Sequence, residues 1–159
     1  ETISDLLKPE GRLVLAETVP QHTQRLHKLV DLASLTTELV ERVVAAEEAI
    51  YTNPADEMVN WAGSDLERIF EKVGLSQIEI AEERLTSQFR IGPEQIARWF
   101  NQNIEGDRPS FAQHLLKETS GASVTPEELS ELKQLFERQL LGQVVSWQST
   151  LVYVVTRKM

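Results

Sequence analysis

The stretch from Leu6 to Thr18 constrains the fold more than any other part of the sequence. Pro9 cannot continue a helix, and Gly11 accepts backbone angles that other residues resist, so we expect a helix to end here. The run Leu13–Ala16 that follows is apolar without polar alternation. Such a run is typical of a strand covered on both faces, as in a parallel sheet with helices on each side. The sequence therefore predicts the middle of an α/β unit.

Helical spacing of apolar residues follows over residues 21–51, and we expect a break at 34–37 where threonines favour a cap. Ser64 and Glu67 form a capping box that predicts the start of a helix, which Gly74 ends. Alternating apolar residues predict a second strand over 77–82, with an extended segment reaching residue 91.

Further helices are predicted after Gly92 and at residues 110–118. A second capping box, Thr125 with Glu128, predicts a helix that Gly142 ends. Residues 144–156 then read as the last strand.

Three of these stretches, in this order, resemble the class I S-adenosylmethionine-dependent methyltransferases. Leu7-Lys8-Pro9-Glu10-Gly11 before an apolar strand is similar to the family's LKPGG signature ahead of its fifth strand, with Glu10 in place of one glycine. Residues 65–81 resemble the family's last helix and sixth strand, and residues 150–158 resemble its antiparallel seventh strand. Together the three stretches cover about a third of the chain.

The resemblance implies an α/β fold, the C-terminal half of a class I methyltransferase (Rossmann-like) domain. We expect three strands, two parallel and one antiparallel that lies between them, with large helical insertions. The expected segments of this single partial domain are a helix end plus strand (1–18), a helical insertion (19–63), a helix plus strand (64–82), a second insertion (83–143) and the closing strand (144–159). Both insertions would leave the sheet at the ligand face, so we expect them to form a lid that selects the substrate.

The cofactor site of that family is absent from the sequence. The family binds S-adenosylmethionine through a glycine-rich turn near its N-terminus, and no G-x-G motif occurs here. The resemblance therefore implies S-adenosylmethionine in the full domain, a missing N-terminal half, and a fragment that binds no cofactor and is not active alone. A first residue that is Glu rather than Met suits this interpretation.

Candidate substrate-binding residues stand at the predicted strand ends. They are Glu17, Thr18, His22, Arg90 and Trp147, and Arg84 lies close to the second strand's end. A carboxylate or imidazole there is a possible proton acceptor, an arginine pairs with anions, and a tryptophan stacks on aromatic groups. The ordinary alternatives stay open: a solvated carboxylate, a capping threonine, a surface histidine, arginines paired with the chain's own acids and a core tryptophan.

No residue is assigned a catalytic role from the sequence, and the spacing of the three histidines does not favour a metal site. The acidic positions 41, 47 and 48 read as a solvated helix face.

Composition excludes several function classes. The absence of cysteine rules out disulfides and thiolate chemistry. A net charge of −9 argues against direct nucleic-acid binding, which depends on excess Lys and Arg. No apolar run is long enough for a membrane span, and we expect a cytoplasmic protein.

Two other interpretations remain. One is a non-catalytic interaction module, since residues 141–150 with the helical insertions resemble the C-terminal region of proteins that join a RarA/MgsA-type recombination-factor AAA+ ATPase to a methyltransferase-like domain. The other is a self-contained α+β binding domain. Because a strand without its neighbour leaves backbone groups unpaired, we also predict self-association of the chain.

Overall fold

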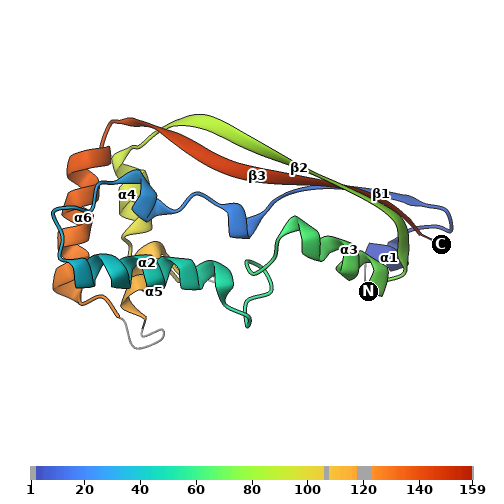
Figure 1. Ribbon diagram of the computed structural model, residues 1–159, viewed down its shortest axis with the longest axis horizontal. Helices are drawn as coiled ribbons and strands as arrows, with labels where there is room; N and C mark the ends of the chain where they lie inside the picture. Colours follow the sequence, from blue (N-terminus) through green and yellow to red (C-terminus); the bar gives the residue numbers. More distant parts are fainter. Residues whose placement is uncertain (1–2, 106–107, 118–122, 159) are drawn as a thin grey trace. The chain divides into compact units, whose positions relative to one another are not determined.

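The computed structural model describes residues 3–105, 108–117 and 123–158 (Figure 1). The chain divides into two compact units, which we name by their content. The sheet unit comprises residues 1–23, 54–86 and 148–159, and the helical unit comprises residues 24–53 and 87–147. Each unit has its own hydrophobic core.

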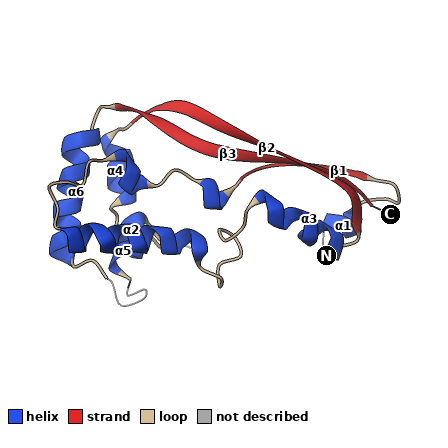
Figure 2. Cartoon of the chain, in the orientation of Figure 1, coloured by secondary structure: helices blue, strands red, loops and turns tan. Residues whose placement is uncertain are grey.

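The elements of the sheet unit are short helices and three strands (Figure 2). They are α1 (Ile3–Leu6), β1 (Arg12–Thr18), the 3-10 turn η1 (Pro20–His22), α3 (Gly63–Lys72), and most of β2 (Leu75–Arg90) and β3 (Val144–Lys158). The helical unit contains the 3-10 turn η2 (Leu26–Leu29), α2 (Thr37–Thr52), α4 (Pro93–Trp99), α5 (Phe111–Leu116) and α6 (Pro126–Leu140). Residues 87–90 of β2 and 144–147 of β3 also belong to the helical unit.

The strand order is β1-β3-β2, so the last strand lies in the centre as predicted. β1 pairs antiparallel with β3, with Arg12 opposite Arg157 and Thr18 opposite Leu151. Hydrogen bonds from Ser76 to Arg157 and from Gln88 to Ser146 follow the antiparallel register between β2 and β3. The expected fold class with two parallel strands is therefore wrong, because every hydrogen-bonded pair of this sheet is antiparallel. The physical reason is that β3 lies between β1 and β2, pairs with both and runs opposite to its neighbours, so no two adjacent strands are parallel.

One face of β1 is open, which corrects the prediction that Leu13–Ala16 is covered on both faces. The strand alternates between half-buried and exposed residues, and Val14 is 65% exposed. Leu13 and Leu15 pack with the core of the sheet unit on the other face. Figure 1 shows α3 along one side of these strands, where Leu66 and Phe70 meet Val152 and Val154. An apolar run alone does not distinguish a strand covered on one face from one covered on both.

The turn before β1 has a left-handed residue at the position where the resembled signature has glycine. Glu10 has φ 62°, a conformation that L side chains adopt at a cost. Gly11 serves a different purpose, since a Cβ on it would lie 2.7 Å from the carbonyl oxygen of Lys8. The turn thus needs close backbone approach at Gly11, while Glu10 tolerates the left-handed angle.

The helical unit is organised around Phe136, which is fully buried. Its ring contacts those of Trp99, Phe100 and Phe111 at centroid distances between 5.2 and 6.2 Å. Aromatic pairs in such tilted or edge-on arrangements are favourable beyond the area that they bury. Buried aliphatic residues of α2, α5 and α6 complete this core.

The predicted helix starts and ends are confirmed in part. Thr125 accepts from the N–H of Glu128, whose carboxylate accepts from the N–H of Thr125, so the second capping box is present. Gly74 and Gly142, with φ 78° and 77°, follow the ends of α3 and α6. The capping box at Ser64 is wrong, because the N-cap of α3 is Ala62, two residues earlier, and the carboxylate of Asp65 accepts from the N–H of Ala62.

Candidate functional site

A polar pocket in the sheet unit brings together two of the arginine and histidine candidates. It has a volume of about 340 Å³ and is lined by His22, Arg84, Leu85, Thr86, Gln148, Ser149 and Thr150. We call it the acceptor pocket. Its residues come from the turn after β1, from β2 and from β3.

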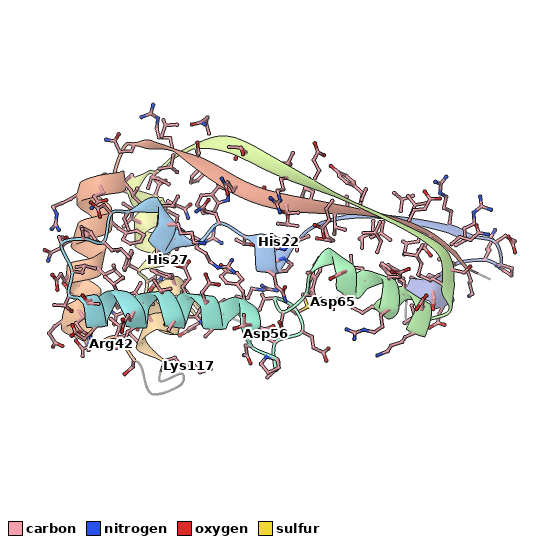
Figure 3. All side chains as sticks on the ribbon, in the orientation of Figure 1. His22, His27, Arg42, Asp56, Asp65 and Lys117 are labelled. Carbon is pink, nitrogen blue, oxygen red and sulfur yellow. The ribbon has the colours of Figure 1, made fainter. Side chains whose placement is uncertain are left out.

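Local hydrogen bonds fix the wall that carries His22. The N–H of Val19 donates to the carbonyl of Thr150 at 2.8 Å, which extends the β1–β3 ladder beyond the end of β1. Pro20 then starts η1, and the N–H of Thr23 donates to its carbonyl at 3.0 Å. His22 therefore sits on a turn that is pinned to the central strand; Figure 3 labels it there.

The charged groups of the pocket are cationic or can become so. Nδ1 of His22 lies 4.0 Å from the Glu82 carboxylate, the longest ion pair of the described residues, and Glu82 does not line the pocket. In the part of the chain that the structure describes, Arg84 makes no ion pair and no side-chain hydrogen bond. Three hydroxyls and one amide supply neutral donors and acceptors. The pocket therefore suits an anionic or hydroxyl-bearing molecule.

The other predicted site residues do not line this pocket. Glu17 and Thr18 are exposed at the end of β1, opposite Val152 and Leu151 of β3. Arg90 belongs to the helical unit, where its guanidinium donates to the carbonyl of Gly142 at 2.7 Å. Trp147 belongs to the helical unit as well. Of the predicted substrate-binding residues, His22 lines the acceptor pocket, and so does the nearby candidate Arg84.

A buried carboxylate in the helical unit is the clearest feature that sequence reasoning missed. Glu47 on α2 is 1% exposed, so its assignment to a solvated helix face is wrong. It accepts from the N–H of Leu26 at 2.6 Å and of His27 at 3.0 Å, and its Oε2 lies 2.6 Å from Nδ1 of His27. Figure 3 shows His27 close to α2. A signal did exist, because position 47 follows Leu39 and Val43 on the same helical stripe.

This carboxylate explains why residues 21–33 do not form the predicted helix. The N–H groups that Glu47 takes belong to the first residues of η2, so the chain docks there as a short 3-10 turn. An expected helix is replaced by tertiary hydrogen bonds that satisfy the same backbone donors.

Next to Glu47, Arg25 contacts two side chains of α2, Glu48 and Tyr51. Its guanidinium donates twice to Glu48 at 3.0 Å and lies 3.8 Å from the ring centre of Tyr51. Burial acts to raise the pKa of Glu48, but the hydrogen bond and charge of Arg25, with the charges of Lys28 and His27, lower it overall. Burial and the nearby charge of Glu47 raise the pKa of Tyr51. These shifts accompany the hydrogen bonds and the ring contact that Arg25 makes with Glu48 and Tyr51.

Comparison with known proteins does not assign the chain to a family. The sequence matches no protein-family model, and a search of curated proteins finds no match either. In residues 3–105, 108–117 and 123–158 no group of acidic, histidine or cysteine side chains is placed to hold a metal ion. No described helix combines the length and the apolar character that a membrane crossing needs.

Proposed function

We propose that this chain is the acceptor-binding, substrate-side part of an S-adenosylmethionine-dependent methyltransferase-like domain. The observation that carries the proposal is the acceptor pocket, which follows the carboxyl end of β1 through the turn Pro20–His22. The central place of the last strand agrees with the order that the resemblance implies.

The side chains of the pocket suit the acceptor rather than the methyl donor. Arg84 is placed to pair with an anionic group, and His22 is placed to take a proton from the atom that receives the methyl group. Hydroxyls of Thr86 and Ser149 supply hydrogen bonds that orient the acceptor. Positioning of this kind is most of what methyl transfer asks of a protein, because the sulfonium donor is already activated.

The described residues do not fit S-adenosylmethionine itself. Among the described lining residues, Arg84 is positively charged and none is a carboxylate, so the pocket repels a sulfonium cation. The sequence also has no G-x-G turn. The proposed domain therefore binds its cofactor through residues outside this chain. The lid role of residues 19–63 and 83–143 and the cytoplasmic location stay predictions.

The alternative is an interaction module appended to a recombination-factor ATPase, and the free edge of β1 favours it. The hydrogen bonds at Val19 and between Lys158 and Gly11 set the phase of the ladder, so the N–H groups of Arg12, Val14, Ala16 and Thr18 point to the free edge. Such an edge is a template for a strand from another molecule. We propose that a second copy of the chain pairs there.

A cofactor titration separates the two functions. It uses the protein as its gene encodes it, with any sequence that flanks residues 1–159, and isothermal titration calorimetry with S-adenosylmethionine and S-adenosylhomocysteine. We expect both to bind, and we expect Arg84→Gln to leave this binding unchanged. Failure of the complete gene product to bind either molecule would overturn the methyltransferase proposal and favour the interaction module.

The pocket itself is tested with inorganic phosphate as the probe. In NMR titrations we expect phosphate to shift the imidazole resonances of His22, and Arg84→Gln to weaken this effect several-fold. Arg68→Gln is the matched control, because Arg68 is an exposed arginine of α3 outside the pocket. Equal phosphate binding in the Arg84 variant and the wild type would contradict the assignment of the pocket.

A further inference from the structure

A second cleft, in the helical unit, has an aromatic wall and two arginines. Its volume is about 470 Å³, and Trp99, Trp147, Arg98 and Arg108 are among its lining residues. It is independent of the acceptor pocket, with which it shares no residue. We call it the tryptophan cleft.

The aromatic wall is held rigidly. Trp99 and Trp147 stack with ring centroids 6.3 Å apart and an interplanar angle of 15°. Phe136 supports Trp99 edge-on at 6.2 Å, and Phe89 packs on Trp147 at 5.7 Å. Trp99 is 8% exposed, whereas Trp147 is half-buried and both reach the cleft. Indole rings that line a cleft offer apolar contacts to a planar aromatic ring.

The charge of the cleft opposes that of the chain. The chain has 25 acidic and 16 basic residues, yet none of the described residues that line the cleft is acidic. Among the described residues, neither Arg98 nor Arg108 makes an ion pair or a side-chain hydrogen bond. Two arginines that have no acidic partner among the described residues, beside stacked tryptophans, have donors that suit an anion. Gln95 and Ser110 add polar groups to the lining.

We propose that the tryptophan cleft binds a nucleoside phosphate. The base would lie against the indole wall, and the phosphate would take hydrogen bonds from Arg98 and Arg108. Guanidinium groups match phosphate oxygens in pairs, and every nucleobase has a face that stacks on an aromatic ring. A free mononucleotide fits better than a polymer, because a net charge of −9 repels a run of phosphates.

The experiment compares AMP with adenosine by isothermal titration calorimetry on the full chain. We expect AMP to bind at least tenfold more tightly than adenosine, because the nucleoside lacks the phosphate. Replacing both arginines (Arg98→Gln with Arg108→Gln) should bring AMP to the affinity of adenosine and leave adenosine unchanged. Trp147→Leu should weaken both ligands to a similar extent.

A control variant and folding measurements separate loss of the binding site from general effects of substitution. Arg138→Gln changes an exposed arginine of α6 outside the cleft and should leave both affinities unchanged. Circular dichroism and thermal melts establish that each variant folds, and both cleft arginines are exposed residues. Equal affinity for AMP and adenosine, or no binding of AMP at millimolar concentration, would overturn the proposal. A single-stranded oligonucleotide that binds far more tightly than AMP would overturn the assignment to a free nucleotide.

Discussion

The helical unit closes its hydrophobic core, whereas the sheet unit leaves one side of its sheet open. Seventeen buried apolar residues form the core of the helical unit, and six form that of the sheet unit, among the residues that the structure describes. The open side of β1 exposes Val14, and no described strand pairs with its outer edge. Because buried apolar area is the main favourable term in folding, we infer that the helical unit supplies most of the stability. The sheet unit offers an open strand edge that suits a partner strand.

The largest expected effect comes from the centre of the helical core. Phe136→Ala removes the ring that three other aromatic rings contact and should lower the free energy of unfolding by about 3–5 kcal/mol. Phe70→Ala in the sheet unit should cost less, because Phe70 is more exposed and packs in a one-sided core. Urea denaturation of both variants measures the difference. A greater loss for the Phe70 variant would reverse the comparison between the units.

The buried carboxylate of Glu47 gives the next effect. Glu47→Gln keeps the size of the side chain, but its amide N–H₂ meets the N–H donors of Leu26 and His27, of which one loses its acceptor. Leaving a buried donor unsatisfied costs roughly 1–3 kcal/mol. Glu41→Gln, at an exposed position of the same helix, should change stability by less than about 0.5 kcal/mol. Equal unfolding midpoints for the two variants would show that the Glu47 network contributes little.

In the sheet unit, replacing the left-handed residue before β1, Glu10, should raise the stability of the protein. Glu10→Gly removes a side chain from a backbone with φ 62° and should raise stability by roughly 0.5–1 kcal/mol after the entropic cost of glycine. The reverse change at an equivalent position, Gly74→Ala, should lower it by about 1 kcal/mol, although an added Cβ there meets no atom within 4 Å. Thermal denaturation of both variants checks the sign. A destabilised Glu10 variant would mean that its side chain makes a favourable interaction.

An ion pair between α2 and α6 should make the helical unit slightly sensitive to acid. The hydrogen bond from Arg42 lowers the pKa of Glu128 below its ordinary value of 4.5, and the N–H of Thr125 lowers it further. A lowered folded-state pKa adds stability at pH values above about 4.5, and this stability is lost as the pH falls through the folded-state pKa. Glu128→Gln should therefore be less stable than the wild type at pH 7 and equal to it at pH 2. Unfolding curves at both pH values measure this, and a constant difference would contradict it.

Local signals in the sequence predicted where helices begin and end better than they predicted which segments pack or pair together. The helix after Gly92, the cap at Thr125 and the stop at Gly142 each depend on one or two turns of chain, and the structure contains all three. The pairing direction of the strands and the open face of β1 depend on which distant segment arrives beside them. Apolar spacing does not encode that information.

The candidate site shows the same limit. His22 and Arg84 lie near predicted strand ends; β2 extends past Arg84 to Arg90, yet both residues line one pocket. Glu47 was assigned to solvent because it is charged, although its spacing from Val43 put it on the buried stripe. The burial of a carboxylate depends on donors that lie about 20 residues away in the chain, at Leu26 and His27. Charge alone therefore gave the wrong environment where tertiary hydrogen bonds decide it.

The smallest expected change in stability, and the sharpest test of the open sheet, is Val14→Lys. Val14 is exposed and its N–H points to the free edge, so a lysine should alter the stability of the monomer by less than about 0.5 kcal/mol. A charged side chain on an edge strand opposes pairing with another strand, and we expect the concentration-dependent association of the wild type to weaken.

Ile69→Lys is the control, because Ile69 is an exposed apolar residue of α3 rather than of a strand. Sedimentation velocity over a range of concentrations distinguishes the two variants. A wild type that remains monomeric at high concentration would remove the second copy as the partner of β1, and equal weakening by both lysines would assign the association to general hydrophobicity rather than to the strand edge.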